Sequence, residues 1–223
     1  MCGRFTQVFT WAEIQEFYAL LNELAPNLKP SWNVAPTQDI GVIGARENGG
    51  LGFTRMRWGL VPSWAKDQSV GAKMINARSD TIAQKPAFRE AFAKRRCVIP
   101  VSGFFEWKGS GAAKTPYFIT SAGEEPLSFA GLWERWRDPE GQWVRTATII
   151  TTDANEALKP LHHRMPVILD RADIARWLAE GGTALLRPCP DDRLTYWPVS
   201  TRVNAVKNDA PDLIEAAASS TLF

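Results

Sequence analysis

Hydrophobic side chains recur along this chain with two periods, one helical and one typical of strands. Residues 10–26 place apolar side chains on one stripe, at the spacing of about 3.6 residues that marks an amphipathic helix. Thr10 and Glu13 form a capping box at the start of this segment, and Pro26 is a stop signal at its end. The pattern therefore predicts a helix over residues 10–26.

Two more helices are expected further along the chain. The first covers residues 85–95 and is opened by Pro86, because proline is favoured in the first turn of a helix. The second covers residues 170–182, where Asp170 is the predicted cap and a Gly-Gly pair ends the helix.

The remaining apolar runs are short and have the character of strands. They are bounded by Gly, Pro, Asn and Asp, and they cover residues 39–45, 52–60, 97–108, 115–122, 126–136, 144–152 and 165–170. Because strands do not alternate regularly with helices, a doubly wound parallel sheet is disfavoured. We predict one α+β domain over residues 1–223, with a core over about 2–213 and a tail from 214. Its sheet is expected to be mostly antiparallel and curled towards a barrel, with the helices outside.

Composition narrows the class of protein. A hydrophobic content of 45% and a charged content of 22% are those of a globular chain, which argues against wholesale disorder. The three cysteines are far apart, and the only two histidines are adjacent, so neither a disulfide framework nor a metal site is expected. No apolar run reaches the length of a membrane span, and the first residues lack a signal-peptide layout, so we expect a cytoplasmic protein.

The first residues, "MCGRF", raise a chemical possibility. A small residue at position 2 generally allows Met1 to be removed, and removal would leave Cys2 with a free amine beside its thiol. Both groups have ordinary pKa values near 8, at about 8 and 8.5, so both are partly nucleophilic at neutral pH. A small second residue without catalytic purpose is the plain alternative.

Polar side chains in extended segments form a second candidate feature. If "MINARSD" is a strand, Asn76 and Arg78 share one face, and by the same rule Cys2 and Arg4 share a face of "CGRF". An amide and two guanidinium groups beside a nucleophile would suit an anionic substrate. Surface salt bridges are the alternative explanation.

Glu106 lies among aromatic residues in "SGFFEWKGS". A carboxyl group in apolar surroundings suits a general acid or base near neutral pH. The strand pattern leaves open whether Glu106 is buried or pairs with Lys108 on the surface, since both side chains share one face.

Two further candidates stand in "LHHRMPVIL" and "WGLVPSWAKD". A histidine just before a strand can serve as a proton shuttle, although a purely structural histidine fits equally well. Trp64, in a loop with proline, could stack on a base or cover the core.

Taken together, these segments resemble one family. The stretches "MCGRF", "WNVAPTQ", "WGLVPSWAKD", "INARSDT", "RRCVIPVSGFFEWK", "HHRMPVIL" and "PVSTRVNAVKND" occur in the order and spacing of the SOS-response-associated peptidase (SRAP) family, over nearly the whole chain. The resemblance implies the SRAP fold and a monomer without a cofactor. It also implies a covalent attachment of the N-terminal cysteine to abasic sites in single-stranded DNA.

The resemblance also implies a role for each matching residue. Cys2 is the nucleophile, Asn76 orients the sugar or the Cys2 amine, Glu106 is the acid and base, and His162 shuttles protons. Arg4 and Arg78 are implied to hold phosphates of the DNA, and Trp64 and Trp107 to stack on its bases. Asn33 and Pro36 are implied to line the path of the strand.

The chemistry of an N-terminal cysteine agrees with this implication. Its amine can form an imine with the aldehyde of a ring-opened abasic site, and its thiol can then close a five-membered thiazolidine. The peptidase name would then refer to removal of Met1 by the protein itself. An N-terminal-nucleophile amidohydrolase and a non-covalent single-strand-binding module are the alternatives.

Overall fold

A computed structural model describes residues 2–20, 29–46, 49–109, 111, 114–123 and 125–217. It confirms the predicted α+β class. The strands are β1 (Phe5–Gln7), β2 (Ser31–Val34), β3 (Asp39–Ala45), β4 (Leu51–Trp58), β5 (Asn76–Arg78), β6 (Arg96–Val101), β7 (Gly103–Lys108), β8 (Thr115–Ser121), β9 (Leu127–Arg137), β10 (Trp143–Asp153), β11 (Arg164–Pro166), β12 (Ile168–Leu169) and β13 (Leu194–Pro198). The α-helices are α1 (Trp11–Phe17), α2 (Arg89–Lys94) and α3 (Ile174–Ala179), and the short 3₁₀ helices are η1 (Gln68–Lys73), η3 (Arg171–Asp173), η4 (Thr183–Leu185), η5 (Asp191–Arg193), η6 (Thr201–Asn204) and η7 (Pro211–Ile214).

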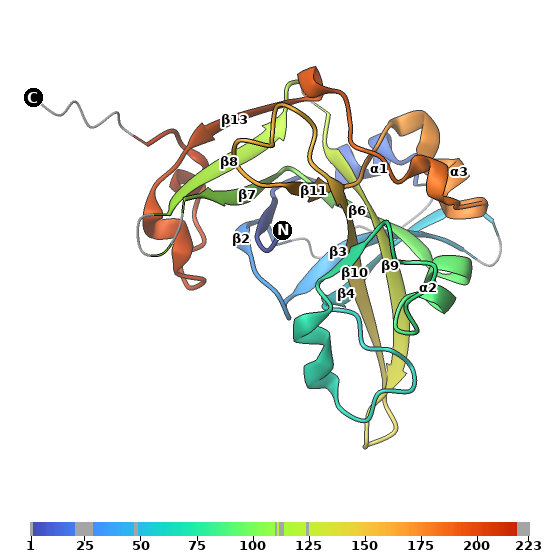
Figure 1. Ribbon diagram of the computed structural model, residues 1–223. Helices are drawn as coiled ribbons and strands as arrows, with labels where there is room; N and C mark the ends of the chain where they lie inside the picture. Colours follow the sequence, from blue (N-terminus) through green and yellow to red (C-terminus); the bar gives the residue numbers. More distant parts are fainter. Residues whose placement is uncertain are drawn as a thin grey trace, which may run out of the picture.

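The strands form two sheets, one of which closes on itself. Strands β10, β4, β3, β6 and β9 are paired in that order, and β9 pairs again with β10, so this sheet is a barrel. The other sheet has the order β13-β8-β7-β1-β2 and is antiparallel throughout. Figure 1 shows the N-terminal segment between this sheet and the barrel. The prediction of a mostly antiparallel sheet curled towards a barrel is confirmed.

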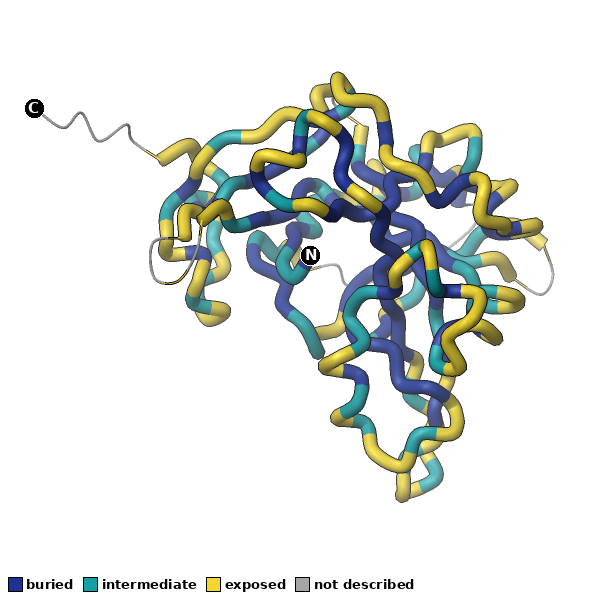
Figure 2. Tube along the Cα trace, in the orientation of Figure 1, coloured by how far each residue is buried: buried dark blue, intermediate teal, exposed yellow. Residues whose placement is uncertain are grey.

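Alternation along the strands divides the core into an inner and an outer part. Ile40 and Val42 of β3 belong to one buried cluster, which also contains Cys2, whereas Ile43 belongs to a second cluster. The second cluster includes Ile14 of α1 and Trp177 of α3, so the helices cover the outside of the barrel, as predicted. Buried residues follow the central strands, and exposed ones gather at turns and hairpin tips (Figure 2).

The first helix begins as predicted and ends early. Thr10 and Glu13 form the expected capping box, with both of its reciprocal hydrogen bonds. The helix stops at Phe17, and Ala19 has a φ of 50°, a left-handed conformation that a continuing helix excludes. The rest of the predicted span, residues 21–28, lies outside the described residues.

Four boundary predictions need correction. The helix expected over residues 85–95 begins only at Arg89, so Pro86 precedes it and does not open it. Asp170 precedes a 3₁₀ turn and its side chain makes no capping hydrogen bond, because α3 itself begins only at Ile174. The run 97–108 is two strands, divided at Ser102. The tail expected from residue 214 does not begin there, since Trp197 donates to the Ile214 carbonyl and Ala216 bridges to β13's neighbour Val199.

One close backbone approach sets the start of the loop after β4. Gly59 has a φ of 123°, and a Cβ atom there would lie 2.5 Å from the Gly71 carbonyl oxygen. We expect Gly59→Ala to lower the free energy of unfolding by about 3 kcal/mol and the melting temperature by roughly 6–12 °C. Gly44→Ala is the control, because no heavy atom lies within 4 Å of its Cβ position. Equal melting temperatures for the two variants, measured by circular dichroism, would contradict the expectation.

Within the described residues, no helix combines the length and the apolar character needed to cross a bilayer.

Candidate active site

An open cavity of about 530 Å³ lies where β1 begins, β7 ends and β8 begins in the five-stranded sheet. Its lining residues come from segments far apart in the sequence: Arg4, Glu106, Trp107, Gly111, Lys114, His162 and Asn204. Four of these, Arg4, Glu106, Trp107 and His162, are among the residues singled out from the sequence. The fold therefore brings together predicted phosphate-binding, stacking and proton-transfer groups.

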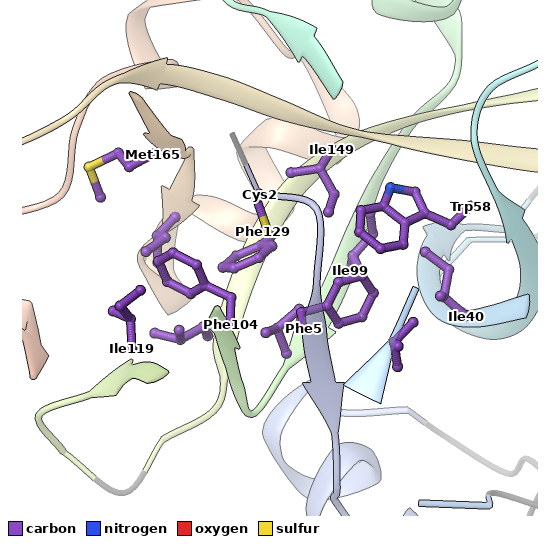
Figure 3. Close-up of a cluster of buried hydrophobic side chains, with 14 of the residues drawn as sticks. Cys2, Phe5, Ile40, Trp58, Ile99, Phe104, Ile119, Phe129, Ile149 and Met165 are labelled. Atoms are coloured by element: carbon purple, nitrogen blue, oxygen red, sulfur yellow. The ribbon is translucent and has the colours of Figure 1, made fainter. Parts of the chain in front are cut away.

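Cys2 does not line this cavity, but its thiol lies close enough to Glu106 of the cavity wall for the Glu106 charge to act on it. Pairing of β1 with β2 and β7 carries the N-terminal segment into the interior, where the Cys2 side chain is buried and its sulfur is directed towards Phe129 (Figure 3). Burial raises the pKa of the Cys2 thiol, and the negative charge of Glu106 raises it further. The thiol is therefore protonated at neutral pH and needs a base before it can attack.

Asn76 holds the backbone of Cys2. Parallel pairing of β5 with β10 sets Asn76 opposite Ile149, and its Nδ2 donates to the Cys2 carbonyl oxygen at 2.9 Å. The Oδ1 atom of Asn76 is buried and has no hydrogen-bond partner within the described part of the chain. Asn76 thus fixes Cys2 and keeps an acceptor available beside it.

Glu106 is buried, with 5% of its surface exposed, whereas Lys108 is exposed. Of the two alternatives left open by the strand pattern, the structure therefore has the buried Glu106 and not a surface pair with Lys108. The Glu106 charge acts on the pKa values of both Cys2 and His162. A carboxylate in this position can exchange protons with groups on either side of it.

The His162 ring is oriented by the backbone. Its Nδ1 accepts a hydrogen bond from the Arg164 amide at 2.9 Å, so in the neutral ring the proton resides on Nε2. Burial lowers the pKa of His162 below its ordinary value, and the Glu106 charge acts in the opposite direction. A neutral His162 at pH 7 would present an N–H donor rather than a base.

His163 stacks on His162, with ring centroids 4.3 Å apart and planes inclined by 25°. Positive charge on His163 lowers the pKa of His162. We expect His163→Asp to raise the pKa of His162, and His163→Phe, which keeps the stack without charge, to give an intermediate value. Because the chain has only two histidines, a ¹H NMR titration assigns the signals directly. A pKa of His162 that is unchanged or lower in His163→Asp would contradict this.

Arg4 is held in place by Asn33. Its guanidinium donates to Asn33 Oδ1 at 2.7 Å and to the Val203 carbonyl at 2.8 Å, and lies 5.9 Å from the centre of the Trp107 ring. Trp107 Nε1 donates to Asn204 Oδ1. Asn33 is 1% exposed and its side-chain amide donates to the Val203 carbonyl, and its expected place along the path of the DNA stays a prediction. Its Oδ1 atom positions the Arg4 guanidinium.

Three other predicted DNA contacts lie outside the cavity. Arg78 is exposed and pairs with Asp80 at 2.5 Å, as in the surface-pair alternative. Trp64 is 65% exposed in the loop after β4, and Pro36 is half-buried in the turn before β3. Their roles toward DNA stay predictions.

Sequence reasoning missed Lys114 and Asn204. Lys114 directly precedes β8, and the pairing of Lys108 with Thr115 brings that end of the strand beside the cavity. Asn204 lies in the recognised stretch "PVSTRVNAVKND", which was the available signal. Across the described residues, no group of three or more metal-ligating side chains is found.

The chain is similar in sequence to proteins of one family. The model of a family described as SOS response associated peptidase (SRAP) matches residues 1–206. The abasic site processing protein YoqW of Bacillus subtilis is 42% identical, over 97% of this chain and 100% of its own length. The abasic site processing protein HMCES of Gallus gallus is 36% identical, over 83% of this chain and 66% of its own length.

A solved structure shows the same fold. A protein from Bacteroides thetaiotaomicron superposes with a TM-score of 0.86 at 27% identity, covering 97% of this chain and 100% of that one. With a family match over most of the sequence and relatives of this identity, the chain belongs to the SRAP family.

Proposed function

We propose that this chain recognises abasic sites in single-stranded DNA and attaches to them covalently through Cys2 once Met1 is removed. Two of its relatives carry the name abasic site processing protein. The observation that carries the proposal is the surroundings of Cys2, where Asn76 holds the backbone and offers a buried, unpaired Oδ1. Leaving such an acceptor unpaired costs about 1–3 kcal/mol, which an N–H of the Cys2 amine or a sugar hydroxyl would recover.

Hydrolysis of the Met1–Cys2 bond comes first in this proposal, since it frees the amine. The amine then adds to the C1′ aldehyde of the ring-opened deoxyribose, and Glu106 passes the two protons that nitrogen loses, one after the other, to the former aldehyde oxygen, which leaves as water. The Nε2–H of the neutral His162 ring donates a hydrogen bond to that oxygen and keeps its proton, so Glu106 is a carboxylate again once the imine has formed. These steps give an imine, as expected of general acid–base catalysis by positioned side chains.

Closure of the thiazolidine ring requires a base, because the thiol is protonated. Because burial keeps Cys2 protonated, Glu106 is placed to accept the thiol proton as sulfur adds to the imine carbon. The imine nitrogen takes up a proton, so the thiazolidine differs from the separate reactants by one lost water. Arg4 and Lys114 would hold flanking phosphates, and Trp107 would stack on a base.

The test compares two oligonucleotides that differ only at the lesion. One carries a natural abasic site and the other a tetrahydrofuran analogue, which has no aldehyde. We expect both to bind and only the first to give a band that resists heat on a denaturing gel. A band with both oligonucleotides would exclude aldehyde chemistry, and a band with neither, from protein lacking Met1, would favour the amidohydrolase or the passive binding module.

A further inference from the structure

One face of the hairpin of β9 and β10 gathers arginine side chains. Arg135 lies directly opposite Arg145, and Arg137 directly opposite Trp143, so all four side chains share one face. Like charges at directly opposed positions destabilise a strand pair. Within the described residues, neither Arg135 nor Arg145 forms an ion pair with a carboxylate. The nearby Asp138 accepts a hydrogen bond from the Gln142 amide.

Trp143 makes this face suitable for a ligand. It is 60% exposed, and the guanidinium groups of Arg135 and Arg137 lie 5.0 Å and 5.9 Å from the centre of its ring. Only Trp64, at 65%, is more exposed among the large apolar side chains of the described residues. Large exposed aromatic side chains beside arginine are typical of surfaces that bind single strands.

The hairpin is joined to the loop that bears Trp64. Trp136 Nε1 donates to the Ala65 carbonyl at 2.6 Å, and the Val61 amide donates to Thr146 Oγ1 at 2.9 Å. Figure 1 shows the hairpin extending beyond the barrel, past this loop. Trp136 and Thr146 lie on the face opposite to Arg135 and Trp143, so this loop is anchored to the other side of the hairpin and leaves the arginine face uncovered.

The same strand also leads to the candidate site. β10 continues from Arg145 to Ile149, which pairs with Asn76, and four residues of strand span about 13 Å. Nucleotides adjoining a lesion held at Cys2 would lie within reach of the hairpin.

We propose that the hairpin face formed by Arg135, Trp143 and Arg145 binds the phosphate backbone of DNA flanking the abasic site. This rests on the proposed function. Guanidinium groups match phosphates in geometry as well as charge, and Trp143 offers a stacking surface that tolerates any base.

The test measures affinity against DNA length. Fluorescence anisotropy is recorded with oligonucleotides of about 5 and about 25 nucleotides, each with a central tetrahydrofuran lesion, so that no crosslink forms. For Arg135→Gln/Arg145→Gln we expect about tenfold weaker binding of the long oligonucleotide and less than about twofold change for the short one. The logarithmic salt slope for the long one should fall in size by about 1.4, or about 0.7 per lost phosphate contact.

The control is Arg176→Gln/Arg187→Gln, which removes two exposed arginines of the α3 region. Equal weakening of both lengths, the same loss in the control, or no loss at all would overturn the proposal. The last result would leave an acidic protein as the candidate occupant. The proposed function is tested separately: it fails if the wild-type protein forms no crosslink with a short oligonucleotide that carries a natural abasic site.

Discussion

Cys2→Ala is expected to give no heat-resistant product with abasic DNA, while its affinity for the tetrahydrofuran oligonucleotide stays within about twofold of the wild type. Alanine has no thiol: if Met1 is removed, the amine stops at an imine that hydrolyses, and if Met1 stays, position 2 has no free amine to react. Only the thiol can close the stable ring. The product is measured on a denaturing gel after heating, and affinity by anisotropy.

Two control variants sharpen this result. Cys2→Ser should also fail to give the stable product, because a hydroxyl group does not replace the thiol. Cys189→Ala, which removes another buried thiol, should crosslink as the wild type does. A heat-resistant band from Cys2→Ala at the wild-type yield would show that a different group attacks the lesion.

Glu106→Gln is expected to slow formation of the crosslink by about 10²–10⁴-fold. The amide has nearly the same shape but cannot accept a proton, so both the amine and the buried thiol lose their base. The rate constant is measured by quenching single-turnover reactions and separating the products on a gel. Affinity for the tetrahydrofuran analogue should change little.

Lys108→Gln is the matched control for Glu106, since it lies on the same strand and face but is exposed. Its rate should equal that of the wild type. A rate for Glu106→Gln within about threefold of the wild type would contradict the assigned role of the carboxylate.

Local signals in the sequence predicted the elements well. The capping box of Thr10 and Glu13 and the strand Asp39–Ala45 depend on neighbours within a few residues, and the structure has both as expected. Period-two alternation put Asn76 and Arg78 on one face of their strand, whereas the contact of Asn76 with Cys2, 74 positions away, was expected only from the resemblance to the family.

What the sequence could not predict depends on contacts between distant segments. Asn33 contacts Arg4 and the Val203 carbonyl, because η6 packs over it from 170 positions away. The alternation predicted that Glu106 and Lys108 lie on the same face of the strand. It could not predict that other segments bury this face at Glu106 and leave it exposed at Lys108.

The most direct test of the account is an intact mass spectrum of the mature protein after incubation with one abasic oligonucleotide and heating. The account predicts a species at the mass of the protein without Met1 plus that of the oligonucleotide, less one water. A spectrum with only free protein lacking Met1 and free DNA would contradict covalent capture by Cys2.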